Sequence, residues 1–366
     1  MRIVFRLDAS VRIGNGHLAR CLTLADQFKE LGCEILFICR PESNKDYESL
    51  FATAYEVRLL QKKTNTIINK KSYSSWLSVD WEQDVNEVIQ IIDNIDADLL
   101  IVDHYGIDAR WHNKVRDYCK KIFVIDDLAD RHLDCDFLLN SSFTNEDKDY
   151  KKFISNKDCI SFLGPNYALI QPKFSNLRLK AKNKREHISS IQEILIFMGS
   201  MDPDNYSSLA INAINQIDWK QSIIVNCILD SHSPSLEKVS NDIESLDLRA
   251  SIHSNTSDME KLIYNADLAI GSGGNSAWER CVLGLPTLLT SIAPNQQRNI
   301  TGITESGAAI YWDSTEDLLT VLESCNEDIN YLISMQEKAF DLCDGLGTKR
   351  ITESIMKEFS SSLLSL

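Results

Sequence analysis

The stretch Ile3-Val-Phe-Arg-Leu-Asp8, followed by Ile13-Gly-Asn-Gly-His17, opens the part of the sequence that decides the fold. Residues Leu18–Leu31 then have helical periodicity, and Glu34–Cys39 is again short and apolar. Short runs of Val, Ile and Leu that alternate with helical segments are typical of βα units on a parallel sheet. The sequence therefore predicts a strand, a glycine-containing loop, a helix and a second, parallel strand.

The same alternation continues along the chain. Further strands of the first half are predicted at Asp98–Asp103, Lys121–Asp126 and Phe137–Asn140. A second series of strands and helices is predicted from Glu193 to Ser306. At about 150 residues per domain, a chain of 366 residues predicts two domains with a cleft between them.

We place the domain boundaries where the pattern of alternation stops. The first Rossmann-like domain is predicted to cover residues 1–175, a linker 176–190, a second Rossmann-like domain 191–344 and a C-terminal helix 345–366. The linker region is polar, lacks clear periodicity and contains five basic residues, Arg178, Lys180, Lys182, Lys184 and Arg185. A solvated connection is favoured there over a phosphate site.

Composition excludes several classes of function. The formal charge of −15 argues against nucleic-acid and anionic-membrane binding, since both need a basic surface. Ten cysteines occur without a CxxC motif, which argues against a zinc ribbon. No run of about 18 apolar residues is present, and the N-terminus reads as a strand and not as a signal peptide. We therefore expect a protein of a reducing cytoplasm.

His17 is the first candidate catalytic residue. It follows Gly14-Asn-Gly16 at the start of the predicted helix, where the helix dipole disfavours imidazolium and favours the neutral base. A histidine that only caps the loop is the alternative. The glycine spacing is not GxGxxG, so NAD binding is a weak alternative.

A second glycine-rich loop, Gly271-Ser-Gly-Gly-Asn-Ser276, joins a predicted strand to a predicted helix. Backbone N–H groups at such a turn can bind a diphosphate. Glu279 lies three residues after Ser276, so it either closes a capping box or reaches ribose hydroxyls.

Other strand ends carry polar residues. The loop Met198–Asn205 follows the first strand of the second domain and is expected to face the same cleft as the loop 271–276. For Asp202 and Asp204 the alternative is a helix N-cap, a role that is favoured for Asp204. Asp103-His-Tyr-Gly106 and Asp126–Arg131 end two strands of the first domain. For the clustered carboxylates we favour substrate recognition over a metal site, with a local ion-pair turn as the alternative for Asp127, Asp130 and Arg131.

The chain resembles the UDP-sugar hydrolases of pseudaminic acid biosynthesis, relatives of the two-domain GT-B glycosyltransferases that include the peptidoglycan N-acetylglucosaminyl transferase. Seven short stretches, in order, carry the resemblance: Arg6–Ser10, Ile13–Ala25, Val102–Asp108, Ile125–Arg131, Gly164–Leu169, Met198–Pro203 and Gly271–Arg280. The chain departs from the family pattern at Leu7, Gln171, Lys173 and Ser200.

The resemblance implies an α/β fold of GT-B type, with two Rossmann-like parallel-sheet domains facing a central cleft. It implies hydrolysis of UDP-2,4-diacetamido-2,4,6-trideoxy-β-L-altropyranose to UDP and the free sugar, without metal or cofactor. His17 would activate water, with inversion at the anomeric carbon. The candidate sugar-binding residues are Asp8, Gly14, Gly16, Asp103, His104, Tyr105 and Asp127. The candidate UDP-binding residues are Gly199, Gly273, Gly274, Asn275, Ser276 and Glu279.

The C-terminal helix of this architecture often returns to the first domain. Two other functions stay open at this point. A glycosyltransferase would use His17 to deprotonate a sugar hydroxyl, and a binding protein would hold a UDP-sugar without turnover.

Overall fold

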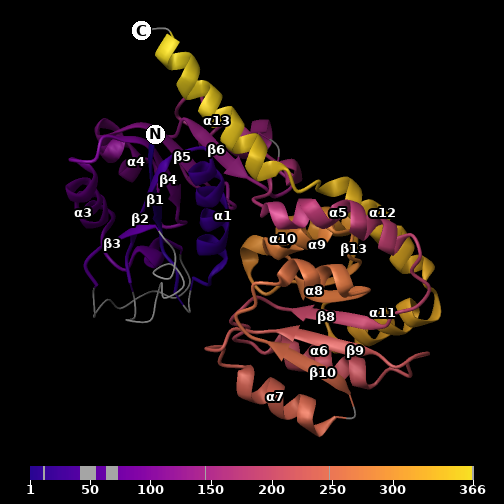
Figure 1. Cartoon of the computed structure of the whole chain (residues 1–366). Coiled ribbons are helices and arrows are strands. Elements are labelled where there is room, and N and C mark those ends of the chain that lie inside the picture. Colours follow the sequence, from indigo (N-terminus) through magenta and orange to yellow (C-terminus); the bar gives the residue numbers. More distant parts are fainter. Residues whose placement is uncertain (11–12, 42–54, 63–72, 145, 247, 365–366) are drawn as a thin grey trace. The chain divides into compact units, whose positions relative to one another are not determined.

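A computed structural model describes residues 1–10, 13–41, 55–62, 73–144, 146–246 and 248–364 (Figure 1). The chain divides into two compact units. Unit 1 contains residues 1–169 and 348–366, and unit 2 contains residues 170–347.

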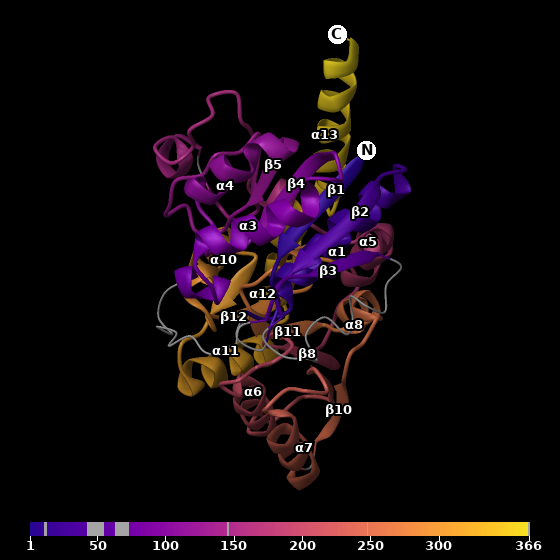
Figure 2. The ribbon, with the colours of Figure 1, turned by 90° about the vertical axis from the view of Figure 1, so that its left-hand side faces the viewer.

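Unit 1 is built on a seven-stranded sheet with the strand order β3-β2-β1-β4-β5-β6-β7. Its strands are β1 (Arg2–Leu7), β2 (Glu34–Cys39), β3 (Glu56–Leu59), β4 (Ala97–Asp103), β5 (Cys119–Ile125), β6 (Phe137–Asn140) and β7 (Ile160–Leu163). Its helices are α1 (Gly16–Glu30), α3 (Trp81–Ile92), α4 (Ala109–Val115) and α13 (Gly347–Leu364), with the short turns η1 (Tyr73–Leu77), η2 (Arg116–Tyr118), η3 (Glu146–Tyr150) and η4 (Pro165–Tyr167). All neighbouring strands pair in parallel, and Figure 2 shows β2, β1, β4 and β5 side by side.

Helices cover both faces of this sheet, which explains why its central strands are continuous apolar runs. On one face Phe5 and Ile101 pack with α1 and with Ile351 and Ile355 of α13. On the other face the core includes Trp111 of α4 together with side chains of α3. Helix α13 therefore contributes to the core of unit 1, although it ends the chain.

Unit 2 repeats the arrangement with a six-stranded parallel sheet in the order β10-β9-β8-β11-β12-β13. Its strands are β8 (Glu193–Phe197), β9 (Ile224–Ile228), β10 (Arg249–His253), β11 (Leu268–Ser272), β12 (Thr287–Thr290) and β13 (Ala309–Tyr311). Its helices are α5 (Pro172–Arg185), α6 (Tyr206–Asn215), α7 (Leu236–Ser245), α8 (Met259–Asn265), α9 (Ser276–Val282), α10 (Gln297–Glu305), α11 (Thr315–Glu327) and α12 (Asn330–Leu342), with the 3₁₀ turn η5 (Pro294–Gln296). The prediction of two parallel-sheet α/β domains is confirmed.

The predicted linker 176–190 differs from the structure, because most of it is helix α5. Four side chains of α5 recur at helical spacing and face the rest of unit 2, namely Phe174, Arg178, Ala181 and Arg185. Arg178 donates to the carbonyl oxygens of Phe340, Val282 and Cys343, and Arg185 to those of Ile263, Ala266 and Leu283. Two of the four inward positions are arginine, so no apolar stripe marks the helix in the sequence.

None of the helices in the described part of the chain combines the length and the apolar character that crossing a bilayer requires.

Candidate active site

The strand order reverses at one point in each sheet. In unit 1 the reversal lies between β1 and β4, where Leu7 pairs with Asp103. In unit 2 it lies between β8 and β11, where Phe197 pairs with Gly271. Open α/β sheets bind ligands outside the carboxyl ends of the strands at such switch points. The His17 loop of unit 1 and the glycine-rich loop of unit 2 both follow strands at these points.

His17 is held by a partner from another strand. Helix α1 begins at Gly16, after Gly14 turns the chain with φ +83° and donates to the carbonyl oxygen of Ser10 at 2.7 Å. The His17 side chain is buried, and its Nδ1 lies 2.7 Å from Oδ1 of Asp103, the last residue of β4. The alternative of a histidine that only caps its own loop does not fit this contact.

Arg20, one helical turn after His17, forms ion pairs with two carboxylates. Its Nε and Nη2 donate to Asp103 at 2.7 and 2.5 Å, and its Nη1 donates to Asp127 at 2.6 Å. The Tyr105 hydroxyl donates to the same Oδ2 of Asp127. We call His17, Arg20, Asp103, Tyr105 and Asp127 the His17 cluster.

The electrostatics of the cluster fix the histidine tautomer. Burial on its own would raise the pKa of Asp103, but Arg20 and His17 outweigh burial and hold that pKa well below its usual value. An ionised Asp103 accepts the proton of Nδ1, so a neutral His17 presents Nε2 as a hydrogen-bond acceptor. Burial and Asp127 raise the pKa of Tyr105 far above its ordinary value, so Tyr105 remains a donor.

Aromatic rings flank the cluster, and one of them, Trp76, is not among the predicted site residues. Trp76 of η1 stacks on Tyr105, with centroids 5.1 Å apart and planes at 27°. The Trp76 and His17 rings form a T-shaped pair, with centroids 5.6 Å apart and planes at 85°. No sequence signal connects a tryptophan in a separate 3₁₀ turn with His17. Arg20, in contrast, lies three residues after His17 on the same helix, and this spacing was available from the sequence.

Asp8 and His104 form a second, deeper network. Arg6 donates to Asp8 at 2.5 Å, the Arg40 N–H donates to Asp8 at 2.7 Å, and Nε2 of His104 lies 3.2 Å from Asp8. Nδ1 of His104 accepts the Gly106 N–H at 3.0 Å. Burial lowers the pKa of His104 despite the neighbouring Asp8. Both ring nitrogens of His104 therefore face groups of the protein itself.

Asp126 is also fully engaged by its own unit. It accepts hydrogen bonds from Arg131 at 2.7 Å, from the Ala129 N–H at 2.8 Å and from the Tyr150 hydroxyl at 2.7 Å. Arg131 additionally pairs with Asp130 at 3.1 Å, so part of the ion-pair turn weighed above is present. Within the described ranges, no three or more His, Cys, Asp and Glu side chains gather as metal ligands do.

The glycine-rich loop of unit 2 is shaped by its neighbours. A Cβ at Gly273 would lie 2.3 Å from Ile300, so only glycine fits against α10 there. At Gly274 space does not require glycine, since a Cβ there would make only an ordinary van der Waals contact, 3.4 Å from the Gln296 side chain. Ser276 begins α9, and its Oγ accepts a hydrogen bond from Arg280 at 3.2 Å. Asn275 occupies the N-cap position without a side-chain cap bond.

Glu279 does not close the capping box that its spacing from Ser276 allows. The N-cap of α9 is Asn275, and no side-chain hydrogen bond caps the helix. Glu279 is partly buried, and burial raises its pKa to about 7 although Arg280 and Lys173 act in the opposite direction. The carboxyl of Glu279 therefore does not serve as a cap of α9.

Gly199 lies in the loop after β8 with φ +83°, where glycine is favoured. In the same loop Asp202 accepts the N–H groups of Tyr206 and Ser207 at 2.9 and 2.8 Å. The N-terminal capping role favoured for Asp204 therefore belongs to Asp202.

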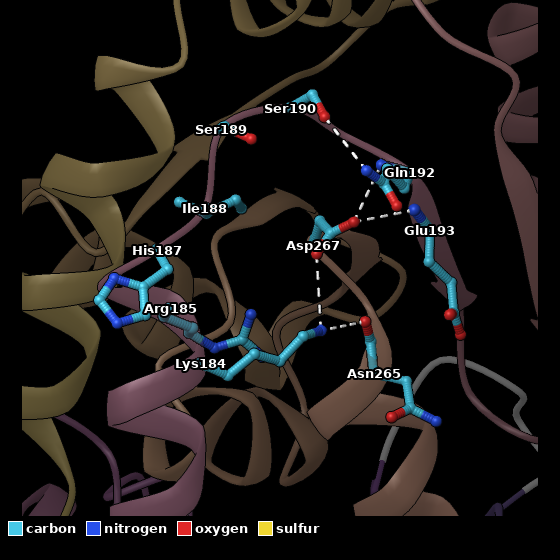
Figure 3. Close-up of a pocket in the computed structure, with 10 residues that line it drawn as sticks. All are labelled: Lys184, Arg185, His187, Ile188, Ser189, Ser190, Gln192, Glu193, Asn265 and Asp267. Carbon is cyan, nitrogen blue, oxygen red and sulfur yellow. Dashed lines mark hydrogen bonds and ion pairs between the residues drawn. The ribbon is translucent and has the colours of Figure 1, made fainter.

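A hollow of about 410 Å³ lies on unit 2, near the residues that precede β8 and β11 (Figure 3). It lies at the end of the sheet where the strands begin, whereas Gly199 and Gly273 follow the ends of strands. Lys184 reaches the Asn265 carbonyl and lies 3.5 Å from Asp267, which also accepts the N–H groups of Gln192 and Glu193. These polar groups pair with one another, and no predicted site residue lines the hollow.

The two Rossmann-like units together define a GT-B fold. Residues 193–354 match the model of the glycosyltransferase family 28 C-terminal domain. The crystal structure of Acinetobacter baumannii MurG superposes with a TM-score of 0.65 at 17% identity, covering 98% of this chain and 100% of that one.

Two relatives are similar in sequence over most of the chain. The UDP-2,4-diacetamido-2,4,6-trideoxy-β-L-altropyranose hydrolase of Campylobacter jejuni is 25% identical over 84% of this chain and 97% of that protein. An uncharacterized protein of Methanocaldococcus jannaschii is 24% identical over 79% of this chain. The match spans 55% of the length of the Methanocaldococcus protein.

Proposed function

We propose that this chain hydrolyses UDP-2,4-diacetamido-2,4,6-trideoxy-β-L-altropyranose to UDP and the free sugar. The similarity to the Campylobacter hydrolase along 97% of that protein supports the substrate class. The observation that carries the proposal is the contact of 2.7 Å between His17 and Asp103. This contact leaves Nε2 of a neutral His17 as a base, and a hydrolase needs a base to activate water.

In the proposed reaction, Nε2 of His17 takes a proton from water while the water oxygen bonds to the anomeric carbon. The bond from that carbon to the UDP oxygen breaks, and its electron pair leaves with UDP. A single displacement inverts the configuration at the anomeric carbon. General-base assistance contributes about 10²–10⁴ in rate. We assign UDP binding to Gly199, Glu279 and residues 273–276, and sugar recognition to the His17 cluster with Gly14 and Gly16.

The test is incubation with a panel of UDP-linked diacetamido sugars, with UDP and the free sugar followed by NMR. Release of both in equal amounts without an acceptor, and an inverted anomer as the first product, would support the proposal. UDP that stays attached to every sugar of the panel would refute it.

A glycosyltransferase is the second candidate, favoured by the match of residues 193–354 to a glycosyltransferase domain. His17 would then deprotonate an acceptor hydroxyl, and UDP release would depend on the acceptor. A protein that only binds UDP-sugars would show UDP affinity without release.

A further inference from the structure

Two cysteine side chains of unit 1 are in contact. The Sγ atoms of Cys135 and Cys159 lie 3.7 Å apart, which is within hydrogen-bonding distance for two thiols. Both residues are free cysteines, and Cys135 is fully buried whereas Cys159 is partly exposed. Neither residue belongs to the His17 cluster or to the loops that we assign to UDP, so the proposed function does not use this pair.

The strand pairing of the sheet holds the two cysteines beside each other. Strands β6 and β7 pair in parallel from their first residues, Phe137 with Ile160, and the cysteines lie just before these residues. Asn156 joins the two segments further. Its Nδ2 donates to the Cys135 carbonyl oxygen at 3.2 Å, and its own carbonyl oxygen accepts the Cys159 N–H at 3.3 Å. Hydrogen bonds therefore hold the backbone next to the thiol pair.

The geometry of this place suits a disulfide bond. Adjacent strands of a sheet lie about 4.8 Å apart, and disulfides join residues whose Cα atoms are about 4.4–6.8 Å apart. Rotation about χ1 can bring the two sulfurs from contact to bonding distance. Cys119 of β5 is also partly exposed, but its thiol faces the carbonyl oxygen of Val115 at 3.8 Å. The contact with a second thiol thus distinguishes Cys159 from Cys119.

We propose that Cys135 and Cys159 are a redox modification site, which a small disulfide such as oxidised glutathione converts into a reversible protein disulfide. The inference is independent of the proposed function. In a reducing compartment the pair stays as two thiols, and it forms the disulfide when oxidised glutathione accumulates.

Exposure determines the order of the two steps. The thiolate of Cys159, the partly exposed partner, attacks one sulfur of oxidised glutathione, whose S–S bond breaks and releases one molecule of glutathione. The Cys135 sulfur then attacks Sγ of Cys159 in this mixed disulfide and releases the second molecule. The protein gives up two electrons and two protons, and the two molecules of glutathione take them up. An excess of reduced glutathione reverses both steps.

The experiment exposes the full chain to mixtures of oxidised and reduced glutathione under native conditions, blocks the remaining thiols with iodoacetamide and maps the peptides by mass spectrometry. We expect a protein that has lost two hydrogens, with a bond between Cys135 and Cys159. The same mixtures in concentrated guanidinium chloride give the reference for the unfolded chain. Because the fold holds the two thiols in contact, the equilibrium constant for this disulfide should be about tenfold or more larger in the native protein.

Three variants separate the pair from the other cysteines. Cys135→Ala should leave glutathione attached to Cys159, and Cys159→Ser should leave Cys135 as a thiol. Cys119→Ser is the matched control, since it removes another partly exposed cysteine of unit 1 and should leave the disulfide unchanged. If Cys135→Ala does not fold, the peptide map of the unchanged protein and Cys159→Ser decide the question.

Three results would each overturn the proposal. The first is a native protein without the bond between Cys135 and Cys159 in an excess of oxidised glutathione. The second is glutathione that stays on Cys159 of the unchanged protein. The third is an equilibrium constant for the disulfide that is no larger in the native protein than in the unfolded chain.

Discussion

Nδ1 of His17 lies 2.7 Å from Oδ1 of Asp103, although 86 residues separate the two in the sequence. The parallel pairing of β1 and β4 produces this contact, because the loop after β1 leads into α1 and Asp103 is the last residue of β4. Arg20 donates to the same carboxylate, which therefore stays ionised beside the histidine. The pair orients the imidazole ring and fixes its tautomer before any substrate binds.

Replacement of His17 should separate turnover from nucleotide binding. In His17→Gln we expect turnover to fall about 10²-fold or more, since the base acts in the transition state, while UDP affinity changes little. Rates of UDP release and calorimetric UDP binding measure the two effects. His232→Gln is the control, because His232 is an exposed histidine of unit 2 and should not alter either quantity. Near-normal turnover in His17→Gln would assign His17 a structural role.

Replacement of Glu279 should act on binding. In Glu279→Ala we expect UDP and substrate to bind more weakly together, because a contact to the ribose is made equally in the ground state and the transition state. Thermal stability should hold, since no capping bond is lost. Glu316→Ala, which removes an exposed carboxylate from the first turn of α11, is the control for a general effect of charge. Unchanged UDP affinity in Glu279→Ala would remove Glu279 from the site.

The sequence alone was sufficient to predict the two sheets, because their central strands are buried on both faces and therefore appear as continuous apolar runs. Phe137–Asn140 even has the predicted bounds. Helix α5 was missed because arginines occupy inward positions that usually hold apolar residues. Trp76 was missed because a contact between distant loops leaves no periodic signal. Partners of buried carboxylates, such as Arg40 with Asp8, likewise depend on the folded chain.

The buried arginine of α5 should matter for stability. Arg185 is 2% exposed and donates to three carbonyl oxygens near the ends of α8 and α9. Arg185→Met would leave these acceptors without their donor, and we expect a loss of about 3 kcal/mol in the free energy of unfolding. Denaturant unfolding measures it. The exposed Lys182→Met on the same helix should cost almost nothing, and equal losses in both variants would contradict this account.

Acid should destabilise unit 1. The pKa values of Asp8, Asp84 and Asp103 lie below their usual value in the folded protein, because arginine partners outweigh burial. A carboxyl with a lowered folded pKa stabilises the fold above its unfolded value of about 3.9, and this stabilisation is lost as the pH falls further. We expect amide hydrogen exchange in the full chain, corrected for its intrinsic pH dependence, to report weaker protection of β1 and β4 between about pH 5 and 2. Protection that stays constant to pH 2 would contradict the role of these ion pairs.

Removal of divalent metal should leave the activity intact. The carboxylates that the sequence places at strand ends in unit 1 are already held by partners of the protein itself, Asp103 and Asp127 by Arg20, and Asp126 by Arg131. A bound cation would have to displace these charge-assisted hydrogen bonds, each of which contributes about 1.5–3 kcal/mol.

Mg²⁺ sites in phosphate chemistry usually need one or two carboxylates together with phosphate oxygens. In our proposal the UDP is bound by residues of unit 2, whereas these aspartates belong to unit 1. We therefore expect UDP release in excess EDTA to match release in added Mg²⁺ or Mn²⁺, with a known metal-dependent pyrophosphatase as the control for chelation. If EDTA abolishes the activity and Mg²⁺ or Mn²⁺ restores it, the reaction is metal-assisted cleavage of the UDP linkage and not displacement by His17-activated water.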